Sequence, residues 1–281
     1  MKLVNGFDLM EFAKRNNFVL PAFNTTNLEM TYAIADGLMK ANLPGYIQIS
    51  SNNLRLSNPA IIAEIARDAV KKSETPIGLH LDHGKSFEDV KACVDAGFTS
   101  IMIDASHLPF EENVKECRRA ADYCHFYGLP VEAELGKVGG QEDSVVAESM
   151  YAVPSECVEM VQKTGIDCLA PALGSVHGPY HGEPKLGFKE MDEINQIVGV
   201  PLVLHGGSGI PEDQIRKAIS LGTAKINVNT ECQQAWTKIV REVIANDEKV
   251  YDPRKIIGPG KKGIQAVVQA KCEIFGCINK A

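Results

Sequence analysis

The sequence lacks long apolar runs and clusters of basic residues. No stretch approaches the roughly 18 consecutive apolar residues that a membrane-spanning helix requires, so we expect no membrane association. Lys and Arg number 29 against 36 Asp and Glu, a net charge of −7, which argues against nucleic acid as a partner. The first residues mix Asp and Glu with apolar side chains, unlike a signal peptide, and this favours a cytoplasmic location.

The eight cysteines include no Cys-x-x-Cys pair. A disulfide framework typically stabilises short secreted chains, whereas 281 residues with 44% apolar content can bury a large core without one. We therefore expect reduced thiols in a protein core. The sequence also lacks a linker, a low-complexity tract and a second core, which predicts one domain over residues 1–281.

Short apolar or β-branched runs recur along the chain, and each ends in polar residues. Their starts are separated by roughly 23 to 38 residues, a spacing typical of strand-plus-helix units with parallel strands. The runs are 19–24, 45–50, 76–82, 100–106, 130–136, 168–174, 201–207 and 224–230. Eight such units predict an α/β fold, a (β/α)8 TIM barrel.

Two segments interrupt this rhythm. Residues 136–154 contain paired glycines and few core-forming positions, and so long a loop after a strand predicts a mobile lid. Residues 174–187 are rich in Gly, Pro and His and are too polar for a core. Beyond the eighth unit, we expect a C-terminal helical extension over about residues 259–281.

His83, His177 and His205 each lie just past the end of an apolar run. In a TIM barrel the carboxyl ends of the strands meet at one rim, where active sites form. Three imidazoles at that rim can bind Zn²⁺ and leave its fourth position open, as a catalytic zinc site requires. One such histidine would more often be structural, but three at matching points predict a metal-dependent enzyme.

Acidic residues at the same rim supply acid–base capacity. Asp82, next to His83, is suited to exchange a proton with a substrate hydroxyl. Glu142 lies in the expected lid, which could carry it into the site; the alternative is a solvated loop acid. Asp104 and Glu134 either anchor the histidines or form a second metal position. Further polar residues at strand ends, expected to line the cleft, are Asn24, Ser50 and Asn227.

A phosphate site is predicted where the seventh and eighth strands end. Segments 205–209 and 227–231 place glycines there, whose backbone N–H groups can approach an anion, together with the hydroxyls of Ser208 and Thr230. The alternative is that the glycines only form a tight turn.

These residues occur in motifs that are spread over the whole chain. The motifs are PAFN (21–24), LHLDHG (79–84), MIDAS (102–106), VEAELG (131–136), GGQED (139–143), VHGPY (176–180), VLHGGSG (203–209) and KINVNTE (225–231). Together they resemble those of the class II, metal-dependent ketose-bisphosphate aldolases, the group of fructose-1,6- and tagatose-1,6-bisphosphate aldolases. The resemblance implies a zinc-dependent aldehyde-lyase that reversibly cleaves a ketose 1-phosphate to dihydroxyacetone phosphate and an aldehyde.

The resemblance also implies roles for individual residues. Zn²⁺ held by the three histidines would polarise the C2 carbonyl and stabilise the enediolate of dihydroxyacetone phosphate. Asp82 would handle the proton of the C4 hydroxyl, and Glu142 the proton at C3. Asp104 and Glu134 would match a second metal position. The residues implied at the C1 phosphate are Gly178, Gly206, Gly207, Ser208, Asn229 and Thr230, with Asn227 near the C2 and C3 oxygens. Family members commonly form homodimers or homotetramers and often use Na⁺ or K⁺ near the phosphate.

The sequence departs from the family at the substrate end away from C1. His181 stands where Lys is usual, Gln265 replaces a C-terminal Lys or Arg, and Asn53 and Arg55 lie where small residues are usual. A pocket with fewer fixed cations suits a sulfonate, which predicts 6-deoxy-6-sulfofructose 1-phosphate as a substrate that yields sulfolactaldehyde. The alternatives are that these changes have no consequence and the substrate is fructose 1,6-bisphosphate, or that it is tagatose 1,6-bisphosphate.

Two rival classes stay open. A Schiff-base aldolase on the same barrel would use Lys225 as its nucleophile, although the three histidines argue against it. A non-catalytic sugar-phosphate binding protein is disfavoured because both catalytic carboxylates are present. The remaining histidines, His80, His107 and His125, have no evident partner in the sequence and are expected to be packing or surface residues.

Overall fold

The computed structural model describes residues 2–136, 138–142, 145–147, 151–180 and 182–280, without the side chains of residues 139–142 and 145–147. Within this part of the chain, parallel strands close into a barrel in the order β1, β2, β3, β4, β5, β8, β10, β11 and back to β1. Their bounds are β1 (Leu20–Asn24), β2 (Gly45–Ser50), β3 (Ile77–Gly84), β4 (Ser100–Ile103), β5 (Val131–Leu135), β8 (Cys168–Pro171), β10 (Leu202–Leu204) and β11 (Thr223–Val228). The predicted TIM barrel is confirmed.

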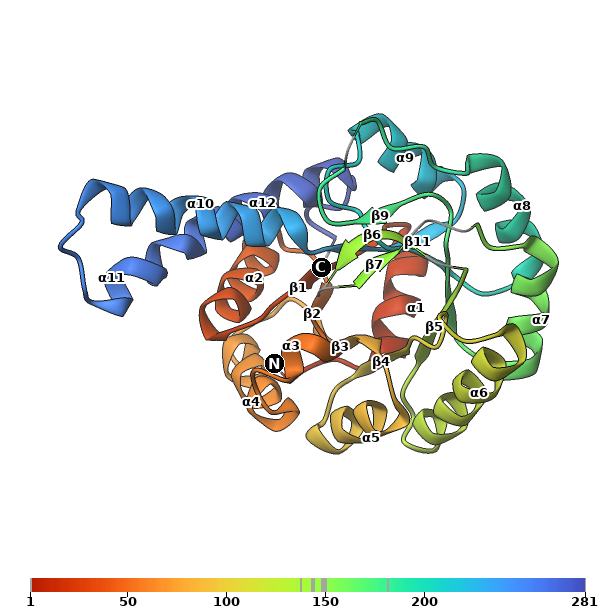
Figure 1. Cartoon of the computed structure of the whole chain (residues 1–281). Coiled ribbons are helices and arrows are strands. Elements are labelled where there is room, and N and C mark those ends of the chain that lie inside the picture. The colour runs from red at the N-terminus through yellow and green to blue at the C-terminus, as the bar shows by residue number, and fades with distance from the viewer. Residues whose placement is uncertain (1, 137, 143–144, 148–150, 181, 281) are drawn as a thin grey trace.

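Helices that follow the strands form a ring around the barrel (Figure 1). They are α2 (Leu28–Ala41), α4 (Pro59–Val70), α5 (Phe87–Ala96), α6 (Phe110–Phe126), α7 (Pro154–Thr164), α8 (Phe188–Val198), α9 (Glu212–Ser220) and α10 (Thr230–Asn246). Side-chain oxygens of Asn27, Asn58 and Ser86 accept backbone N–H groups at the starts of α2, α4 and α5. These helices cover the outer face of the barrel, so its strands are buried on both faces.

The N-terminal end of the barrel is covered by α1 (Gly6–Asn16). Leu9 of this helix packs with Leu20, Ala22 and Tyr46 from the strand starts. The backbone N–H of Gly6 donates to the carbonyl of Thr99. The opposite, C-terminal end of the barrel carries the polar residues that follow the strands. The short helix α3 (Ser51–Leu54) lies there, directly after β2.

The C-terminal part of the chain forms a helical arm. Helix α10 runs out from the barrel, α11 (Pro253–Ile257) lies at its far end, and α12 (Lys261–Ile274) returns beside it (Figure 1). A 3-10 turn at Gly258–Gly260 leads into α12. Helix α12 packs against α2 and α10, so the last helix of the chain is joined to the barrel wall.

The segment expected to be an irregular loop contains a β-hairpin. Strand β6 (Gly139–Glu142) pairs antiparallel with β7 (Val145–Ala147) and parallel with β9 (Val176–His177). Gly140 stands in register with His177. Strands β6, β7 and β9 lie near the centre of the ring in Figure 1. The prediction missed these strands because the glycines and acids of this segment show no alternation of apolar and polar residues.

All eight cysteines lie within the described residues, and each is buried and free, in agreement with the expected core thiols. Among the described helices, none is long and apolar enough to cross a membrane.

Candidate active site

The structure brings the three histidines that follow the strands together at the C-terminal end of the barrel. His83 comes from β3, His177 from β9 and His205 directly follows β10. One ring nitrogen from each can be chosen so that all three lie within 4.8 Å of one another. The centroid of the His83 ring is 5.0 Å from that of His177 and 4.6 Å from that of His205. Residues far apart in sequence therefore form one cluster of imidazoles.

His83 adopts an uncommon backbone conformation that aims its ring. Its φ angle is 47°, in the left-handed region that non-glycine residues seldom occupy, and strain of this kind often accompanies function. The pairing of β3 with β4 shifts register between Leu81 and Gly84 at this point. The hydroxyl of Ser51 donates to the His83 carbonyl at 2.8 Å, and ring atom Nδ1 lies 2.7 Å from Oδ2 of Asp104. These contacts leave Nε2 of His83 to face the cluster.

His205 is anchored by a carboxylate that the sequence analysis did not single out. Its Nε2 donates to Oε1 of Glu132 at 2.9 Å, while Oε2 of Glu132 accepts from Lys225 at 2.8 Å. Burial works to raise the pKa of Glu132, but Lys225 and the hydrogen bond from His205 hold that pKa below its usual range. Glu132 lies two positions before Glu134 on β5, so both side chains are on the same face of the strand. This spacing could have identified Glu132 from the sequence as a further residue of the site.

The donor set at this cluster fits a divalent metal. Buried Nδ1 of His205 and Oε2 of Glu134 are 3.4 Å apart, and within the described residues neither makes a hydrogen bond of good geometry. Burial and the nearby His83 and His205 lower the pKa of His177 to about 3. Histidine binds a metal ion through a neutral ring. His83, Asp104 and Glu134 form a second group whose candidate ligand atoms lie within 4.8 Å of one another. Unpaired buried donors and acceptors of this kind are expected where an ion completes the site.

Asp82 is a buried carboxylate fixed by two amides. Asn24 donates to its Oδ2 at 2.7 Å, and Asn227 donates to its Oδ1 at 3.0 Å. Gln48, which the sequence analysis did not name, donates to Oδ1 of Asn24 at 2.7 Å and so orients that amide.

Asp82 keeps its charge despite its burial. Burial works to raise the pKa of Asp82, but positive charge at His83 and His205, the charge of Lys225 and the hydrogen bond from Asn24 hold it below its usual range. A divalent ion held by the histidines would supply positive charge in place of their ring protons. Its Oδ1 lies 3.9 Å from Nε2 of His83. The site thus presents an ionised base beside the histidine cluster.

A cleft joins this carboxylate to the predicted phosphate residues. Its lining residues are Asn24, Asp82, His83, Val176, His177, Gly178, Gly206, Ser208, Asn227, Asn229 and Thr230. Gly206 has φ 66°, and a Cβ there would lie 2.3 Å from the Val176 carbonyl oxygen. The backbone N–H of Gly207 donates instead to the Asn227 carbonyl, so Gly207 supports the cleft from behind. Helix α10 begins at Thr230, which directs its N-terminus at the cleft and favours an anion there.

The residues predicted for the distal pocket are placed less uniformly. Ser50 and Asn53 are buried beside each other after β2, with the Asn53 N–H 3.4 Å from Ser50 Oγ, and Arg55 is exposed. Gln265 lies on α12 and forms hydrogen bonds with Asp36 and Lys40 of α2. Its role in the distal pocket stays a prediction. The helix turns this residue toward its neighbour, which sequence alignment does not reveal. His181 and the side chain of Glu142 lie outside the described residues; Glu142 ends β6, two positions beyond Gly140.

Lys225 does not have the position of a Schiff-base nucleophile. Its Nζ lies 2.8 Å from Glu132 and 3.3 Å from Nε2 of His80, on the N-terminal side of the barrel interior. His80 and His125, expected to lack partners, both have them: Nδ1 of His80 is 2.8 Å from Ser100 Oγ, and Nε2 of His125 is 2.8 Å from Asp167.

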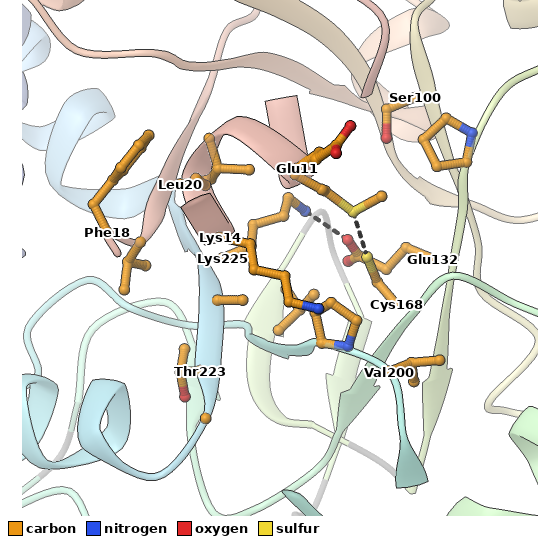
Figure 2. A pocket seen from close by; sticks show the side chains of 18 of the residues that line it. Glu11, Lys14, Phe18, Leu20, Ser100, Glu132, Cys168, Val200, Thr223 and Lys225 are labelled. Atoms are coloured by element: carbon orange, nitrogen blue, oxygen red, sulfur yellow. Dashed lines mark hydrogen bonds and ion pairs between the residues drawn. The ribbon is translucent and has the colours of Figure 1, made fainter. Parts of the chain in front are cut away.

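A larger cavity, of about 820 Å³, lies at the N-terminal end of the barrel under α1. Figure 2 shows Lys225 and Glu132 lining it and joined to each other. The Cys168 thiol, also in its wall, lies 3.0 Å from the sulfur of Met10. The buried charged residues of this cavity, Lys225 and Glu132, pair with each other. In TIM barrels the chemistry takes place at the opposite end.

A histidine cluster that could hold a metal ion, beside a buried carboxylate at the C-terminal rim of a TIM barrel, is typical of metal-dependent lyases and hydrolases. Comparison with known proteins identifies the family within this class. Residues 4–280 match the family described as "Fructose-bisphosphate aldolase class-II", and the chain belongs to that family. It is an aldehyde-lyase of class II.

Individual relatives cover the whole chain. A fructose-bisphosphate aldolase from Geobacillus stearothermophilus is 53% identical over 100% of this chain and 99% of its own length. One from Staphylococcus aureus (strain Mu50) is 52% identical over 100% of both chains. The X-ray structure of the YdjI aldolase from Escherichia coli K12 is similar with a TM-score of 0.87 and 32% identity, over 99% of each chain.

Proposed function

We propose that this protein catalyses reversible retro-aldol cleavage of a ketose 1-phosphate to dihydroxyacetone phosphate and an aldehyde, with fructose 1,6-bisphosphate as its substrate. The observation that carries the proposal is the position of Asp82, which two amides hold in a cleft. The same cleft is lined by His83 and His177 of the histidine cluster and by Gly178 and Gly206. The names of the relatives, which are fructose-bisphosphate aldolases, support the same substrate.

His83, His177 and His205 would hold Zn²⁺, which supplies Lewis acidity at the ketose carbonyl when bound. Asp82 accepts the proton of the C4 hydroxyl as the C3–C4 bond breaks, since it is ionised and its two amides fix its orientation. Oδ1 of Asn227 is buried with no partner in the described part of the chain and is free to accept a hydrogen bond from a substrate hydroxyl.

The glycine segment Gly206–Gly209, here called the phosphate loop, binds the C1 phosphate together with Gly178, Asn229 and the α10 N-terminus at Thr230. Glu142 exchanges the proton at C3: β6 brings its backbone beside β9, the strand of His177. We further propose Na⁺ or K⁺ near the phosphate loop, a second metal position at Asp104 and Glu134, a homodimer or homotetramer, and a cytoplasmic location.

A second candidate substrate is 6-deoxy-6-sulfofructose 1-phosphate. Nδ2 of Asn53 is buried and has no hydrogen-bond partner among the described residues, and Arg55 follows on the surface. An amide donor with one nearby cation suits the single charge of a sulfonate. Tagatose 1,6-bisphosphate has the same C1 phosphate end as fructose 1,6-bisphosphate and differs from it in configuration at C4. Comparing the two substrates therefore tests whether the enzyme selects one configuration at C4.

The test is a cleavage assay on these three ketoses before and after chelator treatment. We expect activity on fructose 1,6-bisphosphate, loss of activity with chelator and recovery with Zn²⁺. Borohydride with substrate should trap no lysine. A higher kcat/KM for 6-deoxy-6-sulfofructose 1-phosphate than for fructose 1,6-bisphosphate would identify the sulfonated ketose as the preferred substrate. Chelator-resistant cleavage, or none on any ketose, would refute the proposed function.

A further inference from the structure

An ion pair between a buried lysine and a half-buried glutamate lies behind the phosphate loop, outside the cleft. Nζ of Lys271, on α12, lies 2.8 Å from Oε1 of Glu231, in the first turn of α10. Only 6% of the Lys271 side chain is exposed. The same ammonium group lies 3.5 Å from the carbonyl oxygen of Gly207. Burial of an ammonium group is costly unless it is paired, so this lysine has a specific partner in the fold.

Glu231 is itself attached to the phosphate loop at two points. Its Oε1 accepts the backbone N–H of Gly209 at 2.6 Å, and its own N–H lies 3.3 Å from Oγ of Ser208. Gly209 has φ 80°, a conformation that glycine adopts readily. The carboxylate thus fixes the loop from the side opposite the cleft.

The charge of Glu231 opposes the task of the loop. The residue follows Thr230, which lines the cleft, so an uncompensated carboxylate here would repel a bound phosphate. Lys271 supplies the opposite charge to the same oxygen atom that holds Gly209. The pair can therefore brace the loop without making the site more negative.

We propose that Lys271 is a positioning residue for phosphate binding: through Glu231 it holds the phosphate loop in place and cancels the carboxylate charge behind it. The inference rests on the phosphate role proposed above for the loop. It makes the C-terminal helix α12 part of the binding machinery, although no residue of α12 lines the cleft.

The test compares Lys271→Met with the wild type, both as full-length, Zn²⁺-loaded protein. Titration of inorganic phosphate by calorimetry should show a Kd raised about tenfold, and the KM of the 1-phosphorylated ketose should rise in parallel. The kcat should change by about twofold or less, because Lys271 contacts neither the reacting atoms nor the histidines. Lys262→Met, at an exposed position of the same helix, is the matched control and should leave both constants unchanged.

Two further variants separate charge from simple damage to the fold. Lys271→Arg should restore phosphate affinity. Adding Glu231→Gln to Lys271→Met should recover most of the lost affinity, since an amide can still accept the Gly209 N–H but carries no charge. This arm remains informative where Lys271→Met alone is poorly folded.

Unchanged phosphate affinity in Lys271→Met overturns the inference, even where the enzyme cleaves its substrate as proposed. If the double variant binds phosphate as weakly as Lys271→Met alone, the charge-balancing part of the inference is overturned. A protein that binds phosphate with this dependence on Lys271 but cleaves no ketose supports the inference while refuting the proposed function.

Discussion

The two ends of the barrel both bury charged residues, yet only one is equipped for chemistry. At the N-terminal end, Lys225 and Glu132 share a cavity of about 820 Å³ and satisfy each other. At the C-terminal end the cleft is narrower. Among the described residues, buried Oε2 of Glu134 and Oδ1 of Asn227 have no hydrogen-bond partner there, and His83 is held in a left-handed conformation. Unsatisfied polar atoms and local strain therefore identify the site better than empty volume does.

The largest expected effect comes from removing the base at the C-terminal end. Asp82→Asn keeps the size and one acceptor of the side chain but cannot take up a proton at neutral pH. We expect kcat to fall by about 10²–10⁴-fold, the usual contribution of a general base. Steady-state kinetics measure this, with zinc content and melting temperature as controls. Retention of more than a tenth of the wild-type kcat would show that another group takes the proton.

Glu132 contacts Lys225 in the N-terminal cavity and His205 of the histidine cluster. Its substitution therefore tests whether a change in the cavity affects metal binding at the other end of the barrel. Glu132→Gln weakens the hydrogen bond from His205 and leaves Lys225 without its counter-charge. Loss of such an outer partner typically weakens metal binding by about 10–100-fold, which a chelator competition assay would detect. Glu11→Gln, at the exposed mouth of the same cavity, is the control. Equal zinc affinity in both variants would mean that the ends are independent.

The phosphate loop offers a test based on backbone geometry. In Gly206→Ala the new Cβ meets the Val176 carbonyl oxygen at 2.3 Å, so the loop must move. Gly128→Ala is a matched control, with φ 69° but no atom within 4 Å of the new Cβ. Both variants carry backbone strain of about 1–3 kcal/mol, seen as lower free energies of unfolding. Only Gly206→Ala should also raise the KM, by about tenfold.

The smallest effect is expected from filling the N-terminal cavity. Val200→Phe adds a ring to its wall (Figure 2 labels Val200). We expect kcat/KM within about twofold of the wild type, because TIM-barrel chemistry lies at the other end. A fall of tenfold or more, with unchanged zinc content, would mean that this cavity takes part in function and would undo the comparison.

The sequence predicted the barrel and the histidine cluster because both depend on local patterns. Strand spacing and polar strand ends indicate which residues reach the C-terminal rim. Partners across the barrel are different: Glu132 meets His205 and Lys225 only after the barrel closes, and no spacing in the chain records that contact. The contacts of Gln265 could not be predicted for the same reason, since packing of α12 on α2 decides which way that residue points. Lys271 was overlooked because it acts from a helix that a pattern describes only as amphipathic.

The cap formed by α1 has a consequence for synthesis on the ribosome. This helix and β1 emerge first, yet β1 pairs with β11, and α1 contacts β11 as well as β1 and β3. The earliest part of the chain must wait for one of the latest before its apolar face is covered, which exposes it to aggregation while translation continues. Slowing or truncating translation before Thr223 should therefore yield nascent chains that depend on chaperones.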